Sequence, residues 1–204
     1  MKLCNIFDKW AWLYDKLLTL FGQPKNYYEH IKAIAQFKKT DNVLDIGGGT
    51  GAIANFVSAD VKKIVLLDPS KGMLSKVKNK NIKKVQGTAQ NMKFKSNTFD
   101  VVYCVDSFHH FTNQKIKADY EKTMNICTKE MLRILKKKGN IVLLEIDPTT
   151  IIGRIIAIFE NTLMHWGSKF YSKEEIKKLF SQYKVDINIK EINSYCYLAK
   201  ITKK

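Results

Sequence analysis

Short apolar runs that alternate with helical stretches constrain the fold of this 204-residue chain more than any other feature. Within a run, apolar residues follow one another directly, which is typical of strands buried on both faces. Because strands and helices alternate, the connections are expected to cross over the sheet, and the strands to run parallel. The runs are 43–46, 63–67, 82–85, 99–105 and 141–146.

The stretches around these runs carry apolar residues at three- and four-residue spacing, which indicates amphipathic helices. The last helix opens with a capping box formed by Ser172 and Glu175. The pattern predicts helices over 7–21, 27–37, 52–59, 71–78, 113–135, 152–166 and 172–183.

Two more runs, 185–189 and 195–201, follow the last helix and are close enough in sequence to pair as antiparallel strands at a sheet edge. All the runs together predict a doubly wound, Rossmann-like α/β fold. We expect a seven-stranded sheet that is mostly parallel, with an antiparallel edge strand and helices on both faces.

The chain is long enough for one core and shows no linker, repeat or low-complexity segment. We therefore expect a single domain over 1–204. Helices in 1–40 precede a core at 41–146, and 147–204 adds the C-terminal helices and the edge strands. No apolar stretch approaches the roughly 20 residues of a membrane span. The amino terminus breaks its apolar character at Asp8, too early for a secretory signal, so we expect a cytoplasmic protein.

The formal net charge is +16, from 35 Lys and Arg residues against 19 Asp and Glu. Such a balance is typical of nucleic-acid partners or of an anionic membrane surface. However, Arg133 and Arg154 are the only arginines, whereas base and phosphate recognition favours the planar guanidinium. The lysines are spread along the chain, with a short cluster, Lys136–Lys138, expected at a turn. We attribute the charge to composition and expect no specific nucleic-acid partner.

The four cysteines are far apart in sequence, without a C-x-x-C pair or a histidine at ligand spacing. This spacing is typical of reduced thiols rather than of disulfides or a zinc site. We predict no metal site. The four are Cys4, Cys104, Cys127 and Cys196.

A glycine-rich turn, Gly47-Gly48-Gly49-Thr50-Gly51, joins the first apolar run to a helix. Glycines let the backbone approach a ligand closely, and the first N–H groups of a helix are available to bind it. Asp68 ends the next run, where its carboxylate is placed to accept hydrogen bonds from both ribose hydroxyls. Turn and acid together predict a nucleoside cofactor.

An NAD(P)-type dinucleotide is an alternative, because Gly47, Gly49 and Ala52 satisfy the pattern G-x-G-x-x-G/A. Two features oppose it. Asp45 brings a negative charge close to where a pyrophosphate would lie. A helical segment of about forty residues also precedes the first strand, whereas dinucleotide-binding folds more often begin directly with it.

The ordered set of motifs resembles class I S-adenosylmethionine-dependent methyltransferases, in particular the small-molecule, type 11-like branch. The resemblance covers roughly Asp41 to Glu145 and implies S-adenosyl-L-methionine as cofactor and S-adenosyl-L-homocysteine as product. It also implies that the segment over 1–40 closes over the cofactor as a lid. The matching segments are 45–51, 67–74, 87–90, 99–103, 107–111 and 132–139.

In that family the glycine turn lies against the methionine part of the cofactor, the acid matching Asp68 holds the ribose, and the segment matching Thr88 and Ala89 flanks the adenine. The family often has an aspartate where this chain has Thr88, so either Thr88 or Gln90 is expected to meet the adenine amino group. The implied cofactor-binding residues are Asp45, Gly47, Gly48, Gly49, Gly51, Asp68, Pro69, Met73, Thr88, Ala89 and Val105.

Asp106, His109 and His110 follow the run at 99–105, at the sheet edge where open α/β sheets bind ligands. They are the candidate catalytic residues, since methyl transfer needs alignment and, for some acceptors, a base. The alternative is structural: one histidine packs under the loop and the other faces solvent, and Asp106 has the same two interpretations.

The positions of the prolines limit the chemical class of the methyl acceptor. The sequence has only Pro24, Pro69 and Pro148. The Pro-Pro-aromatic motif of nucleic-acid amino methylases and the Pro-Cys pair of cytosine-carbon methylases are therefore both missing. A small-molecule acceptor is expected, and the isoleucine-rich stretch 151–166 favours a lipophilic, quinone- or lipid-like one. With the many lysines it also favours weak association with an anionic membrane.

Aromatic residues near both ends of the chain are candidates to wall the acceptor pocket, with plain core packing as the alternative. Three alternatives to a small-molecule methyltransferase stay open: a non-catalytic S-adenosylmethionine-binding protein, a nucleic-acid-associated methylase and an NAD(P)-binding protein. The chain is expected to be a monomer or a homodimer. The aromatic candidates are Trp10, Trp12, Tyr14, Phe159, Trp166, Phe170 and Tyr171.

Overall fold

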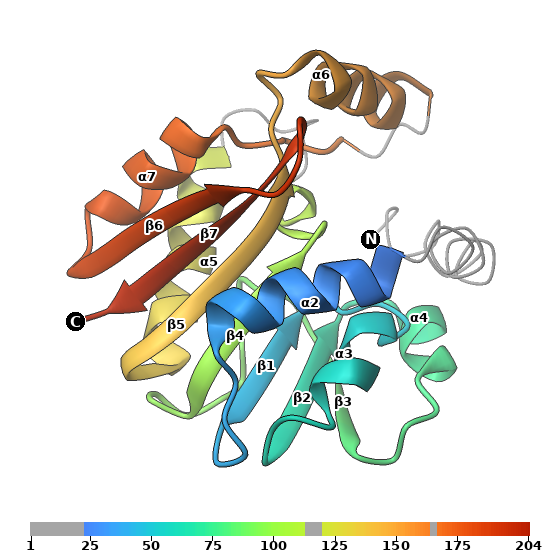
Figure 1. The fold of residues 1–204 in the computed structure, drawn as a ribbon, viewed down its shortest axis with the longest axis vertical. Coiled ribbons are helices and arrows are strands. Elements are labelled where there is room, and N and C mark those ends of the chain that lie inside the picture. The colour runs from blue at the N-terminus through green and yellow to red at the C-terminus, as the bar shows by residue number, and fades with distance from the viewer. Residues whose placement is uncertain (1–22, 113–119, 164–166) are drawn as a thin grey trace.

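A computed structural model describes residues 23–112, 120–163 and 167–204, in which seven strands form one sheet in the order β3-β2-β1-β4-β5-β7-β6 (Figure 1). Neighbours from β3 to β5 pair in parallel, and β7 is antiparallel to both β5 and β6. The predicted mostly parallel seven-stranded sheet is confirmed. The strands are β1 (Asn42–Ile46), β2 (Lys63–Asp68), β3 (Ile82–Gln86), β4 (Phe99–Val105), β5 (Leu135–Ile146), β6 (Val185–Glu191) and β7 (Cys196–Lys203).

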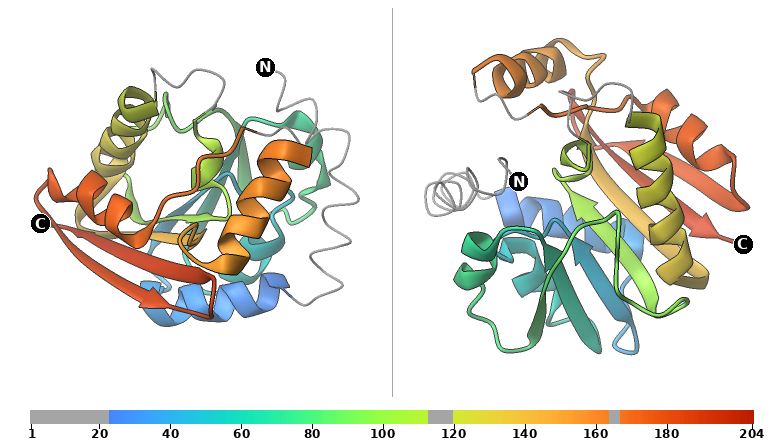
Figure 2. Two further views of the ribbon diagram at one scale, coloured as in Figure 1. Left: turned by 90° about the horizontal axis from the view of Figure 1, so that it is seen from above. Right: turned by 180° about the vertical axis from the view of Figure 1, so that it is seen from behind.

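Helices cover both faces of the sheet, as the sequence predicts (Figure 2). Helices α2, α3 and α4 contribute to one apolar layer, while α5 and α7 contribute to the other. The helices are α2 (Gln23–Ala35), α3 (Ala52–Val57), α4 (Lys71–Lys76), α5 (Tyr120–Ile134), α6 (Ile151–Ile158) and α7 (Lys173–Ser181), with a short 3₁₀ turn η1 (Phe108–His110) and a π-helical turn η3 (Phe159–Leu163).

Two buried layers explain why the central strands are apolar throughout. Val43 and Ile64 pack into the layer under α2 and α3, whereas the next residues, Leu44 and Val65, pack into the layer under α5 and α7. Successive side chains of a strand point to opposite faces, so a sheet covered on both sides needs an apolar residue at every position. Burying each such side chain is worth about 1.5–3 kcal/mol.

The start of β5 corrects the prediction of a turn at Lys136–Lys138. The strand begins at Leu135, which pairs with Phe99, and regular pairing resumes where Asn140 meets Val101. The register shifts in between, and Lys138 has a left-handed backbone with φ 62°. Lys136 Nζ lies 2.8 Å from both carboxylate oxygens of Asp100. The three lysines therefore lie in an irregular part of β5. Because they are polar, the sequence pattern indicated a turn there instead of a strand.

Helix α6 and the π-helical turn η3 together cover the described part of the predicted helix over 152–166. Helix α6 ends at Ile158, where η3 follows, and residues 164–166 lie outside the described structure. Its isoleucines are exposed, with fractions of 79% for Ile151, 62% for Ile155 and 63% for Ile158. In the part of the chain that the structure describes, no helix combines the length and apolar character needed to cross a membrane.

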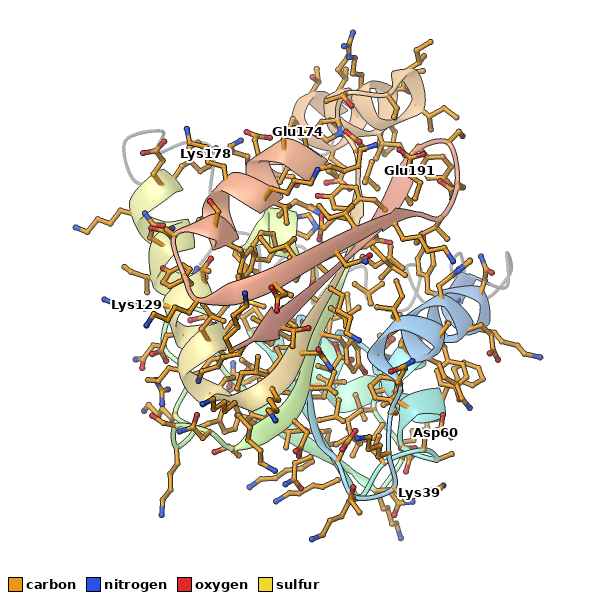
Figure 3. All side chains as sticks on the ribbon, turned by 60° about the vertical axis from the view of Figure 1, so that its left-hand side comes forward. Lys39, Asp60, Lys129, Glu174, Lys178 and Glu191 are labelled. Atoms are coloured by element: carbon orange, nitrogen blue, oxygen red, sulfur yellow. The ribbon has the colours of Figure 1, made fainter. Side chains whose placement is uncertain are left out.

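Charged side chains project from many places on the surface. Figure 3 shows Lys39, Lys129 and Lys178 on separate parts of the molecule, with Asp60 and Glu174 also at the surface. These three lysines lie on different parts of the surface. Cys104, Cys127 and Cys196 are buried free thiols, and Cys4 lies outside the described residues.

Candidate functional site

The turn after β1 is left-handed at three glycines: Gly47, Gly49 and Gly51 have φ values of 72°, 54° and 79°. A side chain at Gly47 would be strained by this backbone, and its Cβ would also lie 2.6 Å from Ser107 Cβ. Ser107 Oγ donates a hydrogen bond of 2.8 Å to the Ile46 carbonyl, which holds the loop after β4 against the turn. The loop after β4 can therefore lie directly against the backbone of the glycine turn after β1, because Gly47 has no side chain.

Asp68 ties the glycine turn to the end of β2. Its Oδ2 accepts the Gly49 N–H at 2.9 Å, and its Oδ1 accepts the Ser70 N–H at 2.8 Å. The sequence offered no obvious partner for this acid, and the structure supplies two backbone ones. Each carboxylate oxygen can accept more than one hydrogen bond, so ribose hydroxyls can still bind there.

A cavity of about 250 Å³ opens where β1, β2 and β4 end. It brings together eight of the predicted cofactor-binding residues and also includes Ser70, Ser107 and Phe111, which the sequence analysis did not select. The eight are Gly47, Gly49, Asp68, Pro69, Met73, Thr88, Ala89 and Val105.

A smaller pocket of about 70 Å³ adjoins the same turn and is lined by Asp45, Gly48 and Tyr27 among others. It shares four residues with the larger cavity, so the two spaces meet at the turn and at the loop after β4. The shared residues are Gly47, Gly49, Val105 and Asp106.

Gly51, also predicted to bind the cofactor, lines neither of the two cavities. It precedes α3 in a left-handed conformation, and a Cβ there would lie 3.2 Å from Val77 Cγ2 and 3.3 Å from Leu66 Cδ1. Position 51 therefore requires glycine because its backbone is left-handed and because a side chain there would crowd Val77 and Leu66.

Asp45 is buried beneath the turn and accepts a hydrogen bond of 3.0 Å from Tyr103 Oη. A Cβ at Gly48 would lie 2.5 Å from Asp45 Oδ2, so the turn passes directly over this carboxylate. Burial raises the pKa of Asp45 to about 8, and the charge of Asp68 adds to the rise. A cation in the small pocket would favour the ionised form.

The segment after β3 supplies Thr88, Ala89 and Gln90 to the cavity wall. The Gly87 N–H donates to the Asp68 carbonyl at 3.2 Å, which holds this segment beside β2. Gln90 Nε2 donates to the Phe111 carbonyl at 2.6 Å and so connects the segment to the loop after β4. Thr88 is exposed at the rim, while Ala89 is buried.

Asp106 lies at the junction of the two spaces. It is a non-glycine residue with φ 45°, a costly conformation that is often found at functional sites. Its Oδ1 is buried and, within the described structure, has no hydrogen-bond partner. Burial and then the charge of Glu145 raise the pKa of Asp106 to about 7. Asp106 therefore holds a proton more readily than an ordinary carboxylate does.

The two histidines differ in their surroundings. His109 lies below the cavities, with Nδ1 2.6 Å from Glu145 Oε2. Burial disfavours protonated His109, but the charges of Glu145 and Glu160 outweigh it and raise its pKa to about 9. His110 lines the larger cavity, and burial together with the charge of His109 lowers its pKa well below the usual value.

Of the three candidate catalytic residues, the structure brings Asp106 and His110 to the cavity but not His109. His109 is buried and lines neither cavity, whereas His110 lies in the wall of the larger one. The sequence analysis missed Glu145 and Glu160. A signal existed for Glu145, which is a charged residue inside the apolar run 141–146.

The predicted aromatic wall is not found among the described candidates. Phe170 stacks on the His109 ring at 4.3 Å and Tyr171 packs against Phe108 at 5.5 Å, so both are core residues. Phe159 is 51% exposed on η3. The remaining candidates, Trp10, Trp12, Tyr14 and Trp166, lie outside the described residues.

Comparison with known proteins agrees with this geometry. A family model described as a methyltransferase domain matches residues 44–143. The uncharacterized protein MJ0638 of Methanocaldococcus jannaschii is 32% identical over 154 residues, which is 72% of this chain and 62% of that protein. The ubiquinone/menaquinone biosynthesis C-methyltransferase UbiE of Francisella tularensis subsp. novicida is 29% identical and aligns with 100% of this chain and 76% of its own length.

Solved structures share the fold. A SAM-dependent methyltransferase of Thermotoga maritima, described as a possible histamine N-methyltransferase, superimposes with a TM-score of 0.77 at 20% identity, covering 98% of this chain and 99% of that one. Fold and site thus define a doubly wound nucleoside-binding domain. The chain belongs to the class I S-adenosylmethionine-dependent methyltransferases, and its cofactor is S-adenosyl-L-methionine.

Proposed function

We propose that this chain transfers the methyl group of S-adenosyl-L-methionine to a small, lipophilic acceptor. The observation that carries the proposal is the meeting of two spaces at Gly47, Gly49 and Asp106. An extended cofactor with an adenosine end and an amino-acid end needs such a pair of spaces, with its sulfonium at the junction.

Each end of the cofactor has suitable partners. The larger cavity offers Asp68 to the ribose and Thr88 and Ala89 to the adenine. The smaller pocket offers the Asp45 carboxylate to the positively charged amino-acid end. Backbone N–H groups of the glycine turn suit the carboxylate of the same end.

The chemistry at the junction is an in-line displacement. When bound, the cofactor would supply an activated methyl group: an acceptor atom would donate an electron pair to the methyl carbon, and the electron pair of the broken carbon–sulfur bond would stay on the neutral thioether of S-adenosyl-L-homocysteine. Where the acceptor carries a proton, Asp106 is placed to accept it, because its pKa of about 7 lies near the working pH. His110, on the same wall, helps to position the acceptor.

A quinone- or lipid-like acceptor is supported by two observations. The exposed isoleucines of α6 offer an apolar surface close in sequence to the end of β5. Relatives named demethylmenaquinone methyltransferase and ubiquinone/menaquinone biosynthesis C-methyltransferase align with most of the chain at 27% and 29% identity. The names describe the acceptors of those relatives, and the same acceptors are the first to test with this chain.

The test has two stages. Calorimetric titration with S-adenosyl-L-homocysteine is expected to show binding that Asp68→Ala weakens at least about tenfold, since a carboxylate–hydroxyl hydrogen bond is worth about 1.5–3 kcal/mol. Asp100→Asn is the matched control, because Asp100 lies at the start of β4 and accepts the Asn42 N–H. Absence of binding at millimolar ligand would contradict the cofactor assignment.

The second stage supplies methyl-labelled cofactor with reduced demethylated quinols, lipid and amine acceptors. Label in a quinol product, lost in Asp68→Ala and reduced in Asp106→Asn, is the expected outcome. Cofactor binding without transfer to any acceptor would identify the chain as a non-catalytic S-adenosylmethionine-binding protein instead.

A further inference from the structure

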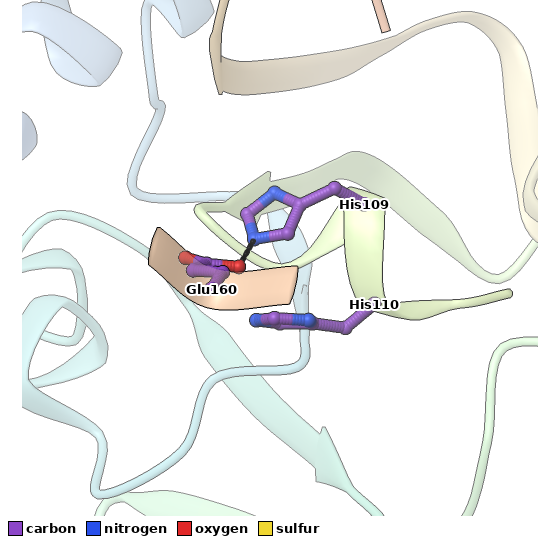
Figure 4. A group of neighbouring side chains, drawn as sticks. All are labelled: His109, His110 and Glu160. Atoms are coloured by element: carbon purple, nitrogen blue, oxygen red, sulfur yellow. Dashed lines mark ion pairs between the residues drawn. The ribbon is translucent and has the colours of Figure 1, made fainter. Parts of the chain in front are cut away.

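Two histidines and a glutamate from distant parts of the sequence converge beside the cofactor cavity. His109 and His110 lie on η1, and Glu160 lies on η3, some fifty residues further along the chain. Figure 4 shows both imidazole rings reaching from η1 toward the Glu160 carboxylate. One nitrogen or oxygen atom from each of the three residues lies within 4.8 Å of the others.

The spacing of these atoms suits a shared cation. His109 Nε2 lies 3.8 Å from Glu160 Oε2, which is too long for a hydrogen bond. Ligand atoms around a tetrahedral ion with bonds of about 2.0–2.2 Å are about 3.3–3.6 Å apart. The three ligand atoms, which lie within 4.8 Å of one another, would move closer together around a bound ion.

Glu145 orients His109 for metal binding. Its Oε1 accepts the Phe108 N–H at 2.9 Å, and its Oε2 lies 2.6 Å from His109 Nδ1. An ionised carboxylate only accepts hydrogen bonds, so His109 Nδ1 must carry the proton. In the neutral ring the lone pair is then on Nε2, the atom that faces Glu160. Histidine ligands of metal ions usually donate their other ring N–H to a carboxylate, a backbone carbonyl or water, and Glu145 is such a partner.

Glu160 is oriented from its own side of the cluster. Ser168 Oγ donates to Glu160 Oε2 at 2.7 Å and lies 3.0 Å from His110 Nδ1. The Lys169 N–H donates to the His109 carbonyl at 3.0 Å, which fastens this segment to η1. A bound cation would take the place of the proton on His109 and would lie beside the carboxylates of Glu145 and Glu160.

We propose that His109, His110 and Glu160 bind one divalent transition-metal ion, with Glu145 and Ser168 as supporting hydrogen-bond partners. Two imidazoles and a carboxylate are a donor set of zinc and related ions, and three protein ligands leave a position open. His110 also lines the cofactor cavity, so the open position is available to water or to an oxygen atom of the acceptor.

The test measures metal binding alone. The full chain is stripped with a chelator and titrated with Co²⁺, followed by its visible absorption and by competition with Zn²⁺. One bound equivalent with the intense bands of four- or five-coordinate Co²⁺ is expected. Glu160→Gln and His110→Ala should each weaken binding at least about tenfold. His30→Ala, on α2, is the matched control and should bind like the unaltered chain.

Titration with S-adenosyl-L-homocysteine and thermal unfolding show whether each variant keeps its fold. Glu160→Gln keeps an oxygen for Ser168 and is the variant that best preserves the cluster. Lack of Co²⁺ binding by the unaltered chain, or equal binding by both folded variants, would overturn the proposal. Because no acceptor is used, a negative result here is distinct from a failure of the proposed methyl transfer.

Discussion

Glycine is required at position 47 for two reasons, one local and one that depends on residues far away in the sequence. Its left-handed backbone can be anticipated from the turn after a strand. The close approach of Ser107, which would lie 2.6 Å from a Cβ at this position, depends instead on how β4 docks beside β1. The role of Asp68 likewise depends both on its place in the sequence and on a tertiary contact. Its place at the end of β2 is visible in the sequence, but its bond to the Gly49 N–H appears only after the two strands pair.

Gly47→Ala is expected to destabilise the protein and to weaken cofactor binding. The left-handed conformation alone costs a residue with a side chain about 1–2 kcal/mol, and the clash with Ser107 adds to that. Urea unfolding and S-adenosyl-L-homocysteine titration measure the two effects. Gly72→Ala, within α4, is the control and is expected to be neutral or stabilising by about 0.5–1 kcal/mol. Equal stability of Gly47→Ala and the unaltered chain would contradict the assigned geometry.

Asp45 predicts a pH dependence of stability in the cofactor-free protein. Its folded-state pKa of about 8 lies far above the ordinary carboxylate value, so the folded protein holds a proton that the unfolded chain has already lost. The free energy of unfolding should therefore fall as the pH rises from about 4 to about 8. Asp45→Asn should lack this component. Urea unfolding across that range measures it, and parallel pH curves for the two proteins would refute it.

Among the helices and strands, the best predicted were those whose signals are local. The capping box at Ser172 is present, with Ser172 Oγ accepting the Glu175 N–H at 3.2 Å and Glu175 Oε2 accepting the Ser172 N–H at 2.9 Å. The start of β5 and the change from α6 to the π-helical turn η3 were not predicted. A register shift and a π-helical turn arise from packing against neighbours, for which the sequence has no periodic signal.

Ser172→Ala is expected to lower the free energy of unfolding by about 0.5–2 kcal/mol, because one N-terminal N–H of α7 loses its acceptor. Ile176 and Phe180 of α7 are part of the core, so fraying of this helix should lower the stability of the whole protein. Chemical denaturation monitored by circular dichroism gives the value. Ser181→Ala, at the other end of α7, is the control, and an identical loss in both variants would argue against a specific cap.

The protein combines an exposed apolar helix face with a large excess of positive charge. Ile155 and Ile158 are more than half exposed on α6, and the net charge is +16. An apolar helix face and basic residues are the two components of binding to an anionic membrane surface. This arrangement also suits a protein that takes a lipophilic acceptor.

The protein is therefore expected to sediment with vesicles containing phosphatidylglycerol and not with neutral phosphatidylcholine vesicles. Added salt should reduce the bound fraction, because it screens the lysines. Ile155→Asp should reduce it too, while Ile126→Asp, at an exposed isoleucine on α5, should not. Equal binding to both kinds of vesicle, or no effect of Ile155→Asp, would contradict the expectation.

The order of residues along the chain determined which segments become strands, where the glycine turn lies and which acid ends β2. These features depend on neighbours in sequence: runs, spacing and backbone freedom. Tertiary structure alone decided that Gly51 packs against Val77, that His109 pairs with Glu145, and that Glu160 reaches the histidines. Such contacts join residues that are far apart in the chain, and they form only when strands pair and helices dock, which no local pattern specifies.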